Sequence, residues 1–226
     1  MLTLLLVALF LFWLNGRCRD ANGADWGFFW LNRLDGLNRL FCRQYHRLQS
    51  APVPLPRKGG AILVSNHISG LDPLLMIASC DRPLRFLIAR EQYQRFGMQW
   101  LFRAVGCIPV DRENSPEKAL RQAFKALSEG EVIALFPHGK IHLDSDPPRK
   151  IKPGAARLAA RAKLPLIALH ISGVAAPGEV MRPVFLRSRA VVKLQAVIHG
   201  SELCDEALNK LIEQALEGLN PANDGY

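Results

Sequence analysis

The 226-residue chain lacks most of the sequence signatures that identify common protein classes. Its five cysteines are odd in number, widely spaced and without a C-x-x-C pair, so we expect reduced thiols rather than a disulfide framework. The absence of a G-x-S-x-G elbow disfavours a serine hydrolase, and no glycine-rich phosphate-binding loop occurs. No zinc-finger spacing, basic-leucine pattern or aromatic RNA-binding motif is present, so nucleic acid is not an expected partner.

The composition describes a basic chain that can bury one substantial core. Hydrophobic residues make up 49% of the sequence, and the formal net charge is +9. This charge favours anionic partners, such as acidic lipid head groups or the phosphates of coenzyme A. Apolar segments near the start of the chain favour a membrane surface among these partners.

The apolar run from Leu2 to Leu14 indicates a membrane anchor. Its thirteen residues would span only about 20 Å as a helix, against a hydrocarbon core of roughly 30 Å, so we expect a segment that lies in or dips into one leaflet. No basic region precedes the run and no small-x-small cleavage site follows, which disfavours a signal peptide. Arg17 and Arg19 follow the run, and the positive-inside rule places the subsequent chain on the cytoplasmic side.

Three regions are expected along the chain: membrane-associating helices in residues 1–50, a linker in residues 51–60 and a catalytic domain in residues 61–226. The helix expected over residues 26–48 is amphipathic and basic, so its apolar stripe can contact either a membrane or the domain. Three prolines between residues 51 and 56 make the linker stiff.

Strand-like and helix-like segments alternate in the domain, which predicts an α/β fold with a mixed sheet covered by helices. We expect strands at residues 61–64, 84–89, 107–110, 132–136, 166–171 and 191–197, and helices from residue 72 and at residues 116–129, 154–162 and 201–219.

A histidine and a carboxylate flank the loop between the first of these strands and the following helix. Asp72 is expected at the N-cap of that helix and Pro73 at its first position. His67 lies five residues earlier, so the two side chains meet only if the intervening turn is compact, for which Gly70 provides conformational freedom. This arrangement is typical of a general base with an orienting acid.

The sequence Asn66-His67, four residues, then Asp72 resembles the first motif of the glycerolipid acyltransferases, also called lysophospholipid acyltransferases. The resemblance implies a membrane enzyme of phospholipid biosynthesis, which transfers a fatty acyl group from acyl-CoA or acyl-carrier protein to a lyso-lipid hydroxyl. It implies that His67 is the base, that Asp72 orients it and that Asn66 contributes to substrate binding. No metal and no cofactor beyond the acyl thioester co-substrate are expected.

Later segments resemble the other family motifs to different degrees. Gly106 and Arg112 have the spacing of the second motif, in which the arginine helps to hold the acceptor phosphate. Residues 136–141 correspond to the third, acceptor-binding motif, but His138 replaces its glutamate and Ile141 its arginine. Residues 164–170 correspond to the fourth motif, an apolar strand, but Ala168 replaces its usual proline, so this match is degenerate.

The third-motif changes predict altered acceptor recognition by His138, Gly139 and Lys140, with backbone donors near Gly139 as candidates for oxyanion stabilisation. Lysophosphatidic acid is the default acceptor. An amino-acid lyso-lipid, glycerol 3-phosphate or another alcohol stays open, as does a non-catalytic lipid-binding protein. A metal site at His138, His142 and the nearby aspartates is the less favoured interpretation of this segment.

Overall fold

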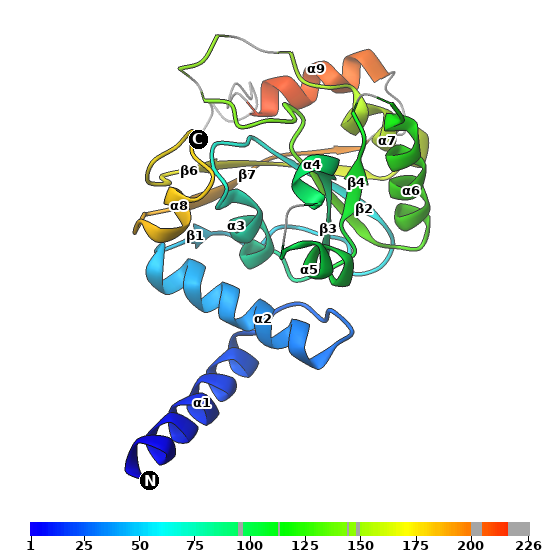
Figure 1. The fold of residues 1–226 in the computed structure, drawn as a ribbon. Helices are drawn as coiled ribbons and strands as arrows, with labels where there is room; N and C mark the ends of the chain where they lie inside the picture. Colours follow the sequence, from blue (N-terminus) through cyan, green and yellow to red (C-terminus); the bar gives the residue numbers. More distant parts are fainter. Residues whose placement is uncertain (95–96, 113, 144, 148–149, 200–204, 217–226) are drawn as a thin grey trace.

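The computed structural model describes residues 1–94, 97–112, 114–143, 145–147, 150–199 and 205–216. These residues form a seven-stranded sheet with helices on both faces (Figure 1). The strand order is β1-β7-β6-β2-β5-β3-β4. The strands are β1 (Gln49–Ser50), β2 (Ala61–Ser65), β3 (Leu84–Ala89), β4 (Ile108–Val110), β5 (Val132–Leu135), β6 (Pro165–Ser172) and β7 (Val191–His199).

The sheet is mixed, as the sequence predicts. Neighbouring strands are parallel except for β6 and β7, which pair antiparallel. The carboxyl ends of the parallel strands β2, β5 and β6 therefore meet at one edge of the sheet, where sites commonly form in α/β proteins. The central strand β2 is buried along its whole length, which explains its continuous apolar sequence.

Alternate residues of the strands supply two separate cores, one on each face. Leu63 and Ala134 face the core beneath α3 (Asp72–Ser79), whereas Ile62 and Ile133 face the core beneath the other helix layer. That second layer consists of α6 (Pro116–Ser128), α7 (Gly154–Ala162) and α9 (Asp205–Leu216). The period of two along each strand thus produces a three-layer fold.

Most predicted strands and helices are confirmed within one or two residues at each end. The helix expected over residues 26–48 is instead α2 (Phe29–Leu40), followed by a π-helical turn, η1 (Phe41–Tyr45). The ends of the last predicted helix, residues 201–204 and 217–219, lie outside the described residues. The sequence did not predict β1 or the short helices α4 (Arg90–Tyr93), α5 (Gln99–Ala104) and α8 (Arg182–Phe185). The three-part division of the chain stays a prediction.

The N-terminal helix α1 (Leu2–Ala21) is longer than its apolar run, because it continues through Asn15 and Gly16. Its 20 residues correspond to about 30 Å, so α1 is long and apolar enough to cross a bilayer. Figure 1 shows α1 projecting away from the sheet, and the side chains of its first half are exposed. The prediction of a segment too short to cross a bilayer therefore underestimated the length of the helix.

Two close contacts join α1 to α2 and α2 to α3. A Cβ atom at Gly36 of α2 would lie 1.8 Å from the carbonyl oxygen of Cys18 in α1, so only glycine permits this approach. On the same helix, Arg39 forms a buried ion pair with Asp35, at 2.6 Å, and also donates to the carbonyl of Ala78 in α3. Because the guanidinium is satisfied by several acceptors, α2 is fixed against α3.

We predict that Gly36→Ala destabilises the protein, because the added methyl group must push α1 away from α2. The expected cost is about 1–3 kcal/mol, which lowers the thermal midpoint by roughly 2–10 °C. The measurement is thermal unfolding of the full chain in detergent. Gly16→Ala is the matched control, since Gly16 has nothing within 4 Å of its Cβ position. Equal midpoints for the two variants would contradict the close helix contact.

Candidate active site

The loop after β2 brings His67 and Asp72 into direct contact. The Nδ1 atom of His67 lies 2.8 Å from Oδ2 of Asp72. The aspartate side chain is fully buried, whereas 19% of the histidine side chain is exposed. Asp72 is the first residue of α3, and Leu71 is its N-cap, so the predicted capping role of Asp72 is wrong. The carboxylate faces back toward the loop.

Three further donors from the loop satisfy the Asp72 carboxylate. Oδ2 accepts hydrogen bonds from the backbone N–H groups of Ile68 and Ser69, at 2.7 and 2.8 Å, and Oδ1 accepts one from the Ser69 hydroxyl, at 2.5 Å. A buried charge is tolerated only with such partners. When His67 is neutral and donates from Nδ1 to this carboxylate, its Nε2 carries a free lone pair.

The His67 ring is also held by residues that follow β5. The Phe136 ring stacks on the imidazole, with centroids 4.1 Å apart and an angle of 15° between the planes. The backbone N–H of His142 donates to the carbonyl of His67, at 2.8 Å. The ring stack and the backbone hydrogen bond together restrict the imidazole to one orientation.

Arg112 reaches the third-motif loop, and its predicted contact with an acceptor phosphate stays a prediction. Its guanidinium donates to the carbonyl of Gly139 and lies 3.6 Å from a carboxylate oxygen of Glu91. The Lys152 side chain lies over the same glycine, because a Cβ atom there would be 3.1 Å from Cε and 3.2 Å from Nζ of Lys152. Gly139 has a φ of 71°, which favours glycine, and its backbone N–H donates to the Phe136 carbonyl. The Gly139 N–H is therefore engaged within the loop, and oxyanion stabilisation by backbone donors near Gly139 stays a prediction.

The other predicted substrate-binding residues lie in different surroundings; they are Asn66, His138 and Lys140. The Asn66 amide is buried and forms two hydrogen bonds with the backbone of Ile171, at 2.7 and 2.9 Å, so it joins β2 to β6. His138 stacks on His142, with centroids 4.7 Å apart, and Lys140 is exposed. Contacts of these residues with a substrate stay predictions.

The segment weighed as a possible metal site lies only partly within the described residues. Asp144 lies outside the described residues, and Nδ1 of His142 is 3.6 Å from a carboxylate oxygen of Asp146. Among the residues that the structure describes, no group of three or more His, Cys, Asp or Glu side chains is arranged to hold a metal ion.

Sequence reasoning missed several residues that position the pair. Ser69 could have been found from its place three residues before Asp72, a spacing typical of local side-chain-to-backbone bonding. Gly70 is needed for a reason other than the predicted conformational freedom. It does not have a positive φ, but a Cβ atom there would lie 2.1 Å from the carbonyl oxygen of Val180. The loop after β6 therefore packs directly on the His67 turn, where Gly178 also donates to Ile68, at 2.8 Å.

A histidine–aspartate pair at the carboxyl edge of a mixed α/β sheet is an arrangement found in enzymes that use a general base. The family model described as Acyltransferase matches residues 44–172, more than half of the chain, and the chain belongs to this family. The matched range contains His67, Asp72, Arg112 and Gly139. It ends at Ser172, the last residue of β6.

Several curated proteins are similar to this chain. N-acylphosphatidylethanolamine synthase of Arabidopsis thaliana is 33% identical over 134 residues, covering 55% of this chain and 46% of the relative. The 1-acyl-sn-glycerol-3-phosphate acyltransferase of Bacillus subtilis is 25% identical over 129 residues, covering 57% of this chain and 63% of the relative. A probable 1-acyl-sn-glycerol-3-phosphate acyltransferase of Mycoplasma pneumoniae is 31% identical, covering 54% and 47%. The chain thus spans about half to two thirds of the relatives' lengths.

The fold is shared with a solved structure. The 1-acyl-sn-glycerophosphate acyltransferase PlsC of Thermotoga maritima superposes with a TM-score of 0.67 over 88% of this chain and 81% of that one. Sequence identity is 18%, so this likeness shows the common α/β fold.

We predict that Asp72→Asn destabilises the turn, because the amide replaces one accepting oxygen with a donor that faces other donors. The expected loss is about 2–4 kcal/mol in the free energy of unfolding, measured by chemical denaturation. Nitrogen NMR should also show a changed tautomer population for His67. Asp81→Asn is the control, since Asp81 is exposed at the other end of α3. An unchanged His67 spectrum in Asp72→Asn would contradict the orienting role.

Proposed function

We propose that the protein transfers a fatty acyl group from a thioester to the hydroxyl of a lysophospholipid, with His67 as general base. The observation that carries this proposal is the 2.8 Å contact between His67 Nδ1 and the buried Asp72 carboxylate. Membership of the Acyltransferase family and the names of the similar bacterial proteins support the same reaction.

The chemistry follows from the arrangement of the pair. An alcohol is a poor nucleophile near neutral pH, and a positioned base typically contributes ~10²–10⁴ in rate. Nε2 of His67 takes the hydroxyl proton as the oxygen attacks the thioester carbonyl. The tetrahedral adduct then collapses, the carbon–sulfur bond breaks, and the imidazolium returns the proton to the leaving thiolate. Asp72 stabilises the imidazolium and holds its orientation throughout. The donor is acyl-CoA or acyl-carrier protein.

Positive charge near Gly139 suits a phosphate-bearing acceptor. Arg112 and Lys152 both contact Gly139, and the exposed Lys140 follows it in sequence. Guanidinium and ammonium groups bind phosphate oxygens well. Lysophosphatidic acid is therefore the first acceptor to test, with His138 and Ile141 as the reason to include an amino-acid lyso-lipid and glycerol 3-phosphate.

A second acceptor class is favoured by one comparison. The plant relative that is 33% identical is named for the synthesis of N-acylphosphatidylethanolamine. We therefore include transfer to the amine of phosphatidylethanolamine as the alternative. In that reaction His67 would take a proton from the head-group nitrogen, rather than from a hydroxyl.

We further propose that α1 and the exposed aromatic residues beside it hold the enzyme on the cytoplasmic face of a membrane. Trp30 of α2 and Trp100 of α5 are neighbours, with ring centroids 5.8 Å apart, and Trp100 is 60% exposed. Exposed tryptophans are typical of membrane–water interfaces. The helices that carry them, α2 and α5, lie at the end of the molecule from which α1 projects (Figure 1).

We predict that His67→Ala lowers acyl transfer by at least ~100-fold while the protein stays folded. The assay uses labelled acyl-CoA and acyl-carrier protein with a panel of lysophosphatidic acid, other lyso-lipids, glycerol 3-phosphate and phosphatidylethanolamine. His199→Ala is the matched control, because His199 is exposed at the end of β7. Activity in His67→Ala equal to that of the control would refute the proposed base. A folded wild-type protein that gives no product with any pair would favour the non-catalytic lipid-binding alternative.

We predict that Leu9→Asp weakens vesicle binding, because a carboxylate in the hydrocarbon core costs roughly 2.5–3.5 kcal/mol. Co-sedimentation with phosphatidylcholine vesicles should fall by about tenfold or more. Leu211→Asp places the same change on an exposed position of α9 and should leave co-sedimentation unchanged. If both variants bind vesicles as the wild type does, α1 is not the anchor.

A further inference from the structure

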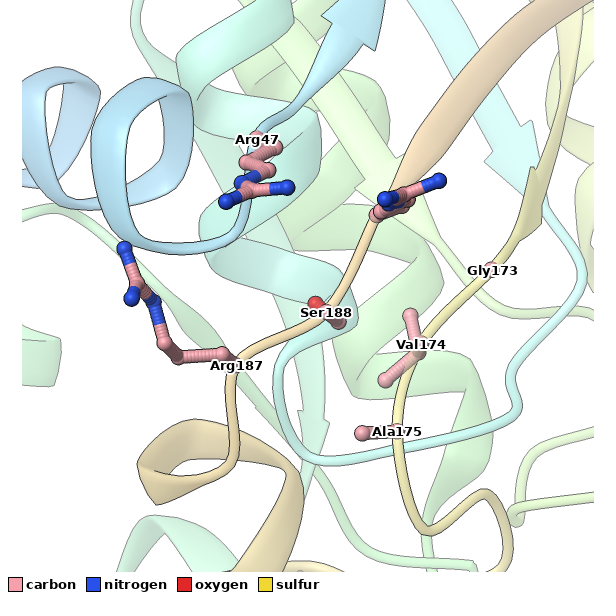
Figure 2. A pocket seen from close by; sticks show the side chains of 7 residues that line it. Arg47, Gly173, Val174, Ala175, Arg187 and Ser188 are labelled. Atoms are coloured by element: carbon pink, nitrogen blue, oxygen red, sulfur yellow. The ribbon is translucent and has the colours of Figure 1, made fainter.

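An arginine-lined pocket lies mostly outside the segment that matches the family, because six of its seven lining residues follow residue 172 and Arg47 alone lies within the match. Its volume is about 510 Å³, and its walls include Arg47, Arg187, Arg189 and Ser188, with residues 173–175 opposite. Figure 2 shows Arg47 on the segment before β1, Arg187 and Ser188 on the segment before β7, and Val174 on the segment after β6. Of the described residues that line it, three are arginines and none is acidic. We call it the arginine pocket.

The backbone around the arginine pocket is fixed by hydrogen bonds. The buried ring of His46 bonds the Ser188 hydroxyl through Nδ1, at 2.8 Å, and its carbonyl accepts from the N–H of Ala190, at 3.0 Å. On the opposite side, the N–H of Arg189 donates to the Gly173 carbonyl, at 3.2 Å. The three arginines therefore start from a frame that exists before any ligand binds, which lowers the entropic cost of binding.

Arg47 occupies a backbone conformation that disfavours its side chain. Its φ is 47°, in the left-handed region that glycine adopts freely and other residues rarely do. Strain of this kind concentrates at binding and catalytic positions. An arginine at this position directs a guanidinium to the pocket, whereas a glycine would relieve the strain and leave one wall uncharged.

Apolar side chains adjoin the charged pocket. Arg187 lies 5.6 Å from the centre of the Tyr45 ring, and the Tyr45 hydroxyl donates to the carbonyl of Phe185. Phe185 and Leu186 are 68% and 40% exposed. In Figure 1 this region, around α8 and β1, adjoins the carboxyl end of α2. A cationic pocket beside exposed apolar residues matches a phospholipid, which carries its phosphate next to its hydrocarbon chains.

We propose that the arginine pocket binds the phosphate of an anionic phospholipid head group at the membrane surface. Guanidinium groups from three positions can each donate two hydrogen bonds to phosphate oxygens. The site is separate from the His67–Asp72 pair and does not depend on the proposed acyl transfer. Soluble phosphates, including those of coenzyme A, share the chemistry, but the exposed Phe185 and Leu186 give no advantage to them.

The test measures binding of the full chain to phosphatidylcholine vesicles with and without phosphatidic acid. Wild-type protein should bind the anionic vesicles more tightly than the phosphatidylcholine vesicles. The variant R47G/R187Q/R189Q should bind the anionic vesicles at least about tenfold more weakly than the wild type. The control K118Q/R121Q/K125Q removes the same three charges from exposed positions on α6, which lies across the molecule from α8 (Figure 1). It should keep most of the gain, because charges away from the contact are screened.

Stability separates a binding role from a structural one. Arg47→Gly alone should leave the thermal midpoint unchanged or raise it, since glycine fits the left-handed backbone, while still weakening anionic binding. Equal losses in the two triple variants would reduce the effect to overall charge and overturn the proposal. Binding of inorganic phosphate or coenzyme A that requires the three arginines, with vesicle binding unaffected, would overturn the lipid assignment. A wild-type protein that binds both vesicle types equally would overturn it as well.

Discussion

The buried carboxylate of Asp72 is the group on which the site depends. A charge with no exposed surface requires several donors, and the loop after β2 supplies them from two backbone N–H groups, one hydroxyl and one imidazole. These hydrogen bonds fix the conformation of the turn, and the turn fixes the position of His67. Because Asp72 is also the first residue of α3, its negative charge lies at the favourable end of the helix dipole. One side chain thus stabilises the fold and orients the candidate base.

The sheet topology then collects the remaining parts. His67 follows β2, Phe136 follows β5 and Gly178 follows β6, and these three strands are adjacent and parallel. Their loops consequently leave the same edge and pack on one another, as the Phe136 stack and the Gly178 hydrogen bond show. Arg112 comes from the chain after β4 and joins them at Gly139. Residues spread over more than a hundred positions become one site because strand ends coincide.

The sequence predicts what local chemistry determines. The apolar strands, the helices with Pro or Gly at their ends and the His67–Asp72 pair each leave a signal within about ten residues. The missed features depend on distant partners: β1 exists only because Gln49 pairs with Val191, and Gly70 is required by the carbonyl of Val180. Asn66 shows the same limit, since its amide bonds the backbone of Ile171, 105 residues away, and no local pattern indicates that contact. A single sequence carries no record of such long-range contacts.

The helix α3 links the N-terminal helices to the candidate base. At its carboxyl end, the Arg39 guanidinium from α2 donates to the carbonyls of Ala78 and Cys80, where a positive charge also complements the helix dipole. At its amino end, Asp72 holds His67. Under the proposed membrane association, the orientation of α2 on the bilayer therefore sets the orientation of the site through one rigid helix of eight residues. A water-insoluble acceptor requires such an arrangement, because its hydroxyl is confined to the membrane surface and the base must approach it from a fixed direction.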